Sequence, residues 1–162
     1  MAKVLLTGMS GTGKSTALAE LGARGHRVVD TDSDEWNEWV ALPDGSQDWV
    51  WRLDAITELL TGHRAGHLFV AGCRSNQDRC YPLFDRIVLL SAPIDVMLAR
   101  IVARTTNQFG KSPAERAKIL ADHAEVQPLL RAGVDLEIDT TAPLGAVVDQ
   151  LERAADLVHA GP

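Results

Sequence analysis

Short apolar runs alternate along the chain with longer stretches of helical spacing. The apolar runs predict five strands, at residues 3–7, 27–30, 68–71, 86–90 and 135–138. The other stretches predict helices at residues 14–24, 49–61, 94–104, 113–131 and 144–158. Strands that alternate with helices are typical of a parallel sheet covered by helices. The pattern therefore predicts an α/β fold of that kind.

Glycine and one capping sequence mark the ends of several predicted helices. Gly25 and Gly62 stand where a glycine C-cap is common. The stretch Ser112-Pro113-Ala114-Glu115 is a capping box with proline at the first helical position. A helix is therefore expected to begin at residue 113.

Length and charge narrow the class of protein. The chain has 162 residues, 46% of them hydrophobic, and a net charge of −6, which fits one globular domain over residues 1–162. Nucleic acid and membrane surfaces favour a basic partner, and no run approaches the ~20 apolar residues of a membrane span. We therefore expect a cytoplasmic protein that binds a small molecule, as a monomer or a homodimer, and neither nucleic acid nor membrane.

The stretch GMSGTGKST, residues 8–16, holds the spacing G-x-x-x-x-G-K-[ST] of a phosphate-binding loop. Its glycines let successive backbone N–H groups point at an anion, and the following helix adds its first-turn N–H groups. Lys14 would reach the β- and γ-phosphates, as a catalytic group, and Ser15 would bind Mg²⁺. No N-K-x-D guanine-specificity sequence is present. We expect ATP and Mg²⁺ as cofactors, with the nucleotide held by Gly8, Ser10, Gly11, Thr12, Gly13, Lys14, Ser15 and Thr16.

A second polar group follows the second predicted strand, where Asp30 and Asp32 flank Thr31. If that strand lies near the first one, these carboxylates lie beside the phosphate-binding loop, because ligands of open α/β sheets bind at the carboxyl ends of the strands. One carboxylate could hold Mg²⁺ and the other could accept a proton from a substrate hydroxyl. The alternative is an aspartate-rich turn without a chemical role.

The phosphate-binding loop, the DTD at residues 30–32 and the later stretch PLLRAGVDLEIDTTAP together resemble shikimate kinase and, more loosely, the gluconate and adenylylsulfate kinases. The resemblance runs over most of the chain. It implies the P-loop NTPase fold, a three-layer α/β/α sandwich with a five-stranded parallel sheet, similar to the nucleoside monophosphate kinases and equipped with a LID. It also implies that Asp30 is linked to the metal and that Asp32 faces the substrate hydroxyl as a catalytic group.

Further positions match the family one at a time. Arg104 matches the arginine that packs on adenine, and Lys111 stands as the catalytic cation of a LID over residues 105–112, where the family has arginine. Thr140 and Pro143, in IDTTAP, fall where the family wraps backbone around adenine. Arg52 resembles an arginine of the family that binds the substrate anion.

The chain departs from shikimate kinase at two places. The family's triple glycine after the third strand appears as Gly72-Cys73-Arg74, and its second carboxylate-binding arginine falls on Val126. The loss of that arginine argues against shikimate as substrate, because it removes a bidentate, charge-assisted contact. Gly72 and Arg74 are substrate candidates, with Asn76 and Gln77 nearby, and the alternative is that this loop is only capped and solvated.

Four tryptophans lie within sixteen residues, in a predicted substrate-binding insertion at residues 31–62. They are Trp36, Trp39, Trp49 and Trp51. Trp36 and Trp39 are three residues apart and could share a helix face, where Trp36 would contact the substrate. The alternative is a small satellite core beneath the insertion.

These features favour an ATP- and Mg²⁺-dependent phosphotransferase, a kinase that moves the γ-phosphate of ATP to a hydroxyl of a small polar metabolite. A nucleoside or nucleotide kinase is one alternative. A P-loop NTPase or switch that hydrolyses ATP without an acceptor is another.

Overall fold

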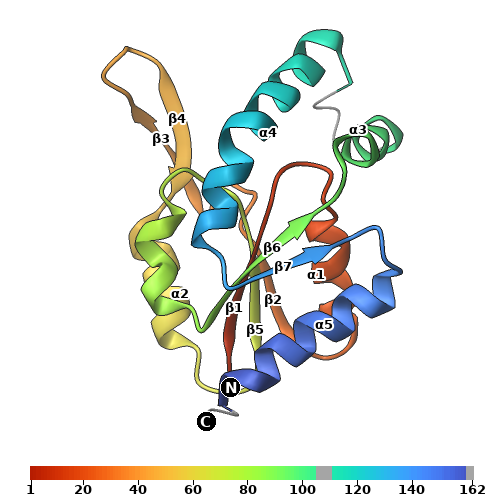
Figure 1. The fold of residues 1–162 in the computed structure, drawn as a ribbon. Coiled ribbons are helices and arrows are strands. Elements are labelled where there is room, and N and C mark those ends of the chain that lie inside the picture. The colour runs from red at the N-terminus through yellow and green to blue at the C-terminus, as the bar shows by residue number, and fades with distance from the viewer. Residues whose placement is uncertain (105–110, 160–162) are drawn as a thin grey trace.

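A five-stranded parallel sheet forms the centre of the protein. The computed structural model describes residues 1–104 and 111–159, so most of the predicted LID, at residues 105–110, lies outside the described residues. The strand order is β2-β5-β1-β6-β7, and all neighbours in this sheet are parallel (Figure 1). Its strands are β1 (Lys3–Thr7), β2 (Arg27–Asp30), β5 (Leu68–Ala71), β6 (Arg86–Ser91) and β7 (Leu136–Asp139).

Helices cover both faces of the sheet (Figure 1). The α-helices are α1 (Lys14–Ala23), α2 (Leu53–Gly62), α3 (Ile94–Ala103), α4 (Pro113–Gly133) and α5 (Leu144–Asp156), and two short 3-10 helices are η1 (Gln77–Leu83) and η2 (Leu157–His159). The predicted α/β fold, a three-layer sandwich around a five-stranded parallel sheet, is confirmed. None of the helices in the described part of the chain is long and apolar enough to cross a membrane.

The strands bury both faces because their side chains alternate between two cores. In β1, Val4 and Leu6 pack with α1 and α5, whereas Leu5 lies between them in sequence and packs with α2 on the opposite face. All three are completely buried. A strand that is buried on both sides reads as a continuous apolar run, which is why the sequence pattern located these strands well.

The predicted helix at residues 49–61 is wrong in its first part. Residues Asn37–Ala41 form β3 and residues Gln47–Trp51 form β4, an antiparallel hairpin in which Trp39 pairs with Trp49. The helix begins only at Leu53. A turn containing Asp44 and Gly45, with a φ of 87° at the glycine, reverses the chain, as is typical of hairpin turns. The idea that Trp36 and Trp39 share a helix face is therefore also wrong.

Helix-end predictions had mixed outcomes. Gly25 follows α1 with a φ of 94°, as expected of a glycine at a helix C-terminus. Gly62 is still the last helical residue of α2, and the helix ends at His63 in an extended conformation. Ser112 Oγ accepts a hydrogen bond from the Glu115 backbone N–H at 3.1 Å and caps α4 as predicted.

The hairpin is attached to the sheet through Trp51. The Trp51 side chain is completely buried, and its Nε1 donates to Thr31 Oγ1 at 2.9 Å. The side-chain amide of Asn76 accepts from the Trp51 N–H and donates to the Trp51 carbonyl, each at 3.0 Å. The base of the hairpin is thus joined to the segments that follow β2 and β5.

We predict that Trp51→Ala lowers the free energy of unfolding by about 3–5 kcal/mol, because it leaves a large cavity in the core. The matched control is Trp39→Ala in the same hairpin, where the side chain is 64% exposed and the loss should stay below about 1 kcal/mol. Urea denaturation followed by circular dichroism measures both values. Equal losses for the two variants would contradict the anchoring role of Trp51.

Candidate active site

A cleft of about 780 Å³ opens at the carboxyl ends of the parallel strands. The residues that follow four of the strands line it: the loop after β1, Asp30 to Asp32 at the end of β2, Gly72 to Arg74 after β5, and Thr140 to Ala142 after β7. This edge is where open α/β sheets bind their ligands. The segments carrying the sequence candidates are therefore brought together by the topology of the sheet.

Glycine is required in the loop between β1 and α1. Gly8 and Gly11 have φ angles of 148° and 82°, in the region that side-chain-bearing residues rarely adopt. A Cβ would lie 2.4 Å from the Leu90 carbonyl oxygen at Gly8 and 2.6 Å from the Met97 carbonyl oxygen at Gly11. The loop therefore packs directly against the backbone of β6 and α3, which leaves no room for a side chain at either glycine.

Lys14 is the first residue of α1, and its side chain reaches back to the loop. Its Nζ donates to the carbonyl oxygens of Gly8 and Met9, the second at 3.0 Å. Burial lowers the pKa of the Lys14 ammonium below its usual range, and Cys73 and the two aspartates oppose that shift. Phosphate oxygens would restore a favourable environment for the charged form, because an opposite charge nearby stabilises it.

The start of α1 offers backbone donors to an anion. Gly13 is the N-cap, and no side chain within the described ranges caps the helix. Ser10, Ser15 and Thr16 line the cleft. Thr12 instead is completely buried, and its Oγ1 donates to the Met9 carbonyl at 2.8 Å, so its side chain supports the loop from within.

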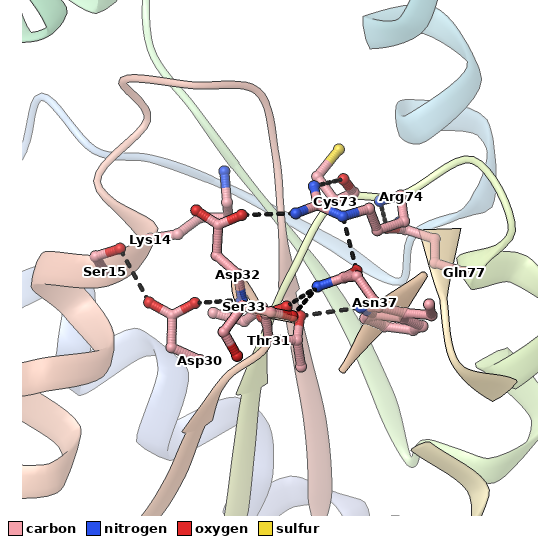
Figure 2. Close-up of polar contacts among 12 residues, drawn as sticks. Lys14, Ser15, Asp30, Thr31, Asp32, Ser33, Asn37, Cys73, Arg74 and Gln77 are labelled. Atoms are coloured by element: carbon pink, nitrogen blue, oxygen red, sulfur yellow. Dashed lines mark hydrogen bonds and ion pairs between the residues drawn. The ribbon is translucent and has the colours of Figure 1, made fainter. Parts of the chain in front are cut away.

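Asp30 joins the end of β2 to α1 (Figure 2). Its Oδ2 accepts a hydrogen bond from Ser15 Oγ at 3.3 Å, and its Oδ1 accepts from the Asp32 N–H at 3.0 Å. A hydroxyl and a carboxylate are hard oxygen donors of the kind that Mg²⁺ prefers, and Mg²⁺ usually takes few protein ligands beside phosphate and water. The donor set therefore fits Mg²⁺, with Ser15 and Asp30 as the residues that would hold it.

Asp32 forms an ion pair with Arg74, from the loop after β5. Arg74 Nη2 donates to Asp32 Oδ1 at 2.6 Å. The other carboxylate oxygen, Oδ2, accepts no hydrogen bond from any residue that the structure describes. Figure 2 shows Asp32 between Lys14 and Arg74. One oxygen is thus held by a cation and the other remains available at the wall of the cleft.

The opposite end of the cleft has an arginine that sequence reasoning missed. Arg100, on α3, donates to Thr140 Oγ1 and to the Thr140 carbonyl, both at 2.8 Å, and to the Gly11 carbonyl at 3.2 Å. It connects the phosphate-binding loop to the loop after β7. The sequence could have indicated it, because Arg100 lies four residues before Arg104 and residues four apart share a helix face.

Arg104 and Thr140, which the sequence suggested as neighbours of adenine, both line the cleft. Pro143 does not contribute to the lining and is the N-cap of α5. Apolar side chains at Ala142, Leu144 and Val147 complete this wall. A largely apolar wall with a few polar groups suits a flat base.

Besides Thr12 and Pro143, three described residues that were predicted to act in the site lie outside the lining of the cleft: Trp36, Arg52 and Lys111. Trp36 is half-buried and packs against the core that contains Trp51. Arg52 donates to the Asp34 carbonyl at 3.2 Å and to Glu38 at 3.5 Å. The assignment of Lys111 to a LID remains a prediction from sequence.

Gly72 lines the cleft, but its surroundings give it a packing role. A Cβ at this position would lie 2.4 Å from Thr31 Oγ1 and 2.8 Å from the Trp51 ring. The side chains that hold the hairpin therefore occupy the space that a side chain at position 72 would need. Substrate contact at Gly72 can only be made by its backbone.

Asn76 and Gln77 build the loop after β5. Asn76 holds Trp51, as described above. Gln77 is 3% exposed; its Oε1 accepts from the Arg74 N–H, and its Nε2 donates to Thr7 Oγ1 and Tyr81 Oη. Both amides are thus used in loop capping, the alternative that the sequence left open.

The four tryptophans have separate environments. Trp51 is core and Trp36 packs on that core. Trp39 and Trp49 form a cross-strand stack with ring centroids 6.1 Å apart. Trp49 also lies against Arg74, whose Cζ is 4.5 Å from the Trp49 ring centroid. The cluster is therefore partly core and partly an aromatic surface on the hairpin.

Solved structures share this architecture over nearly the whole chain. TT1252 from Thermus thermophilus has a TM-score of 0.64 at 16% identity, covering 99% of this chain and 98% of the other. Shikimate kinase from Bacteroides thetaiotaomicron has a TM-score of 0.68 at 14% identity, covering 96% and 99%. Shikimate kinase from Acinetobacter baumannii, solved in complex with shikimate, has a TM-score of 0.60 at 16% identity, covering 99% and 94%. None of the curated proteins matches the sequence.

The fold and the glycine-rich loop define a nucleotide-binding protein of the P-loop kinase and NTPase class, with the architecture of shikimate kinase. Residues 4–121 match the family described as AAA domain. Because the match extends over most of the chain, the protein belongs to that family.

We predict that Lys14→Ala weakens binding of Mg·ATP by roughly 10- to 100-fold, the effect of losing a hydrogen-bonded charge. Isothermal titration calorimetry measures the affinity, and thermal denaturation checks that the variant is folded. The control is Lys118→Ala on α4, whose Nζ pairs with Asp122 at 3.0 Å on an exposed helix face. A folded Lys14→Ala protein with unchanged affinity would contradict the phosphate-binding role of this lysine.

Proposed function

We propose that the protein is an ATP- and Mg²⁺-dependent phosphotransferase that moves the γ-phosphate of ATP to a hydroxyl of a small polar metabolite. The observation that carries this proposal is the arrangement of Asp32. One of its oxygens accepts a hydrogen bond from Arg74, and the second accepts none from the residues that the structure describes, at the wall of the cleft that the phosphate-binding loop also lines. A carboxylate oxygen at this wall is positioned to accept a proton from an acceptor hydroxyl, which is the group that a kinase needs there.

The nucleotide would lie along the cleft from the phosphate-binding loop to α5. Backbone N–H groups of residues 10–15 and the Lys14 ammonium would bind its phosphates. The base would lie between Arg104 and the apolar side chains after β7, which line the same cleft. Ser15 and Asp30 would hold Mg²⁺, which neutralises phosphate charge when bound.

Asp32 would bind the acceptor hydroxyl through Oδ2 and take its proton. The acceptor oxygen forms a bond to the γ-phosphorus while the bond from that phosphorus to the β,γ-bridging oxygen breaks, so ADP leaves with the electron pair. Lys14 stabilises the charge that gathers on the transferring group. Phosphoryl transfer depends mainly on such positioning and charge stabilisation.

Two other functions for the same fold differ in their acceptor. A nucleoside or nucleotide kinase would use a base-containing acceptor, and a P-loop NTPase or switch would use water. Formation of ADP from Mg·ATP, measured with and without sugars, cyclic polyols, nucleosides, nucleotides and aminoglycosides, separates the three. The proposal expects strong dependence on one class of small metabolite. A constant rate across the panel would support the NTPase.

We predict that Asp32→Asn lowers kcat roughly 100-fold or more, the scale of a lost general base, while the affinity for Mg·ATP changes little. Steady-state kinetics and calorimetry measure the two quantities. Asp34→Asn is the matched control, because Asp34 lies two residues away, is exposed and does not line the cleft. A loss of ATP affinity with unchanged kcat would instead place Asp32 with the metal.

A further inference from the structure

All three nitrogens of the Arg74 guanidinium donate hydrogen bonds within the protein. Nε donates to Asn37 Oδ1 at 2.9 Å, Nη1 to the Cys73 carbonyl at 2.8 Å, and Nη2 to Asp32 Oδ1 at 2.6 Å. One of its faces lies against the Trp49 ring. The side chain is 18% exposed, whereas that of Asp32 is 63% exposed. Each nitrogen of the fork thus already has an acceptor.

Two of these contacts, those with Asn37 and Trp49, come from the hairpin. Asn37 is 1% exposed, and its Nδ2 donates to the carbonyls of Thr31 and Ser33, the second at 2.7 Å. With both carbonyls fixing its amide, only Oδ1 can turn toward Arg74, as Figure 2 shows. Asn37 and Trp49 lie on the same face of the hairpin, because side chains on a strand alternate and Asn37 pairs with Trp51. This face holds Arg74 in position.

The insertion that carries Asp32 is strongly acidic, whereas the cleft as a whole is lined, among the described residues, by four cations and two aspartates. Residues 31–62 contain eight acidic residues and one basic residue, Arg52, a net charge of −7 within a chain whose net charge is −6. Arg52 itself is engaged with Asp34 and Glu38. A carboxylate or phosphate beside Asp32 would be repelled by that carboxylate and would compete with it for the charge of Arg74.

We propose that Arg74 is a positioning residue for Asp32, and that the acceptor is therefore a hydroxyl compound without a carboxylate, phosphate or sulfate group. The inference rests on the proposed function and specifies its substrate class. Arg74 orients Oδ1 so that Oδ2 meets the acceptor hydroxyl. The stack of exposed Trp39 on half-buried Trp49 offers the uncharged ring of such an acceptor a surface beside Arg74.

Matched pairs of acceptors test the substrate class. The probes are shikimate methyl ester with shikimate, glucose with glucuronate, and adenosine with adenosine monophosphate, each assayed for ADP formation from Mg·ATP. We expect stimulation by uncharged members only, with kcat/KM at least tenfold above that of the acid partner. Equal or better stimulation by an acid member would overturn the inference and leave the proposed function intact. Stimulation by none would contradict the proposed function, and the inference would fall with it.

A double-mutant cycle with the best acceptor of that panel tests the role of Arg74. If Arg74 acts through Asp32, Arg74→Gln lowers kcat at least tenfold with little change in the KM of the acceptor, and adds nothing to Asp32→Asn. Arg74→Lys should restore only part of kcat, because lysine lacks the planar fork. Arg79→Gln, the loss of an exposed charge on the opposite side of the hairpin, should leave both constants unchanged. A raised KM and additive losses would show that Arg74 binds the acceptor.

Discussion

The parallel register of three neighbouring strands determines where every candidate group lies. Leu6 of β1 and Asp30 of β2 both pair with Ala71 of β5, so the three strands end in one row. The phosphate-binding loop, the two aspartates and the loop that carries Arg74 all leave from this row. β5 lies between β1 and β2, and the loop that follows it brings Arg74 to Asp32. The position of the site thus follows from the order and register of the strands alone.

The hairpin formed by β3 and β4 adds a second constraint on this edge. Trp51 and Asn76 attach its base to the sheet, and Asn37 and Trp49 then hold Arg74 against Asp32. Figure 1 shows that the hairpin projects from the body of the protein on the side of α2. The insertion, whose net charge is −7, therefore also orients the carboxylate proposed to activate the acceptor.

Local sequence signals predicted the sheet and the phosphate-binding loop, because apolar runs and glycine spacing act over a few residues. β1, β2 and β5 have the predicted bounds, and β6 and β7 differ by a residue. The hairpin was missed because Trp49, Val50 and Trp51 fit either a buried helix or a strand. The partners of Arg74 and Arg100 were missed for another reason: Asn37, Trp49 and Thr140 are distant in sequence, and only tertiary packing brings them near.

In the proposed reaction, phosphate moves to a hydroxyl acceptor at Asp32 and is not released to water. The most direct test follows the γ-phosphate of labelled ATP into products in the presence of the uncharged acceptors. We expect the label to appear in a phosphate ester of one acceptor, in amounts equal to the ADP formed, and Asp32→Asn to abolish this product. Recovery of all the label as inorganic phosphate, at a rate that no acceptor changes, would contradict the proposed reaction.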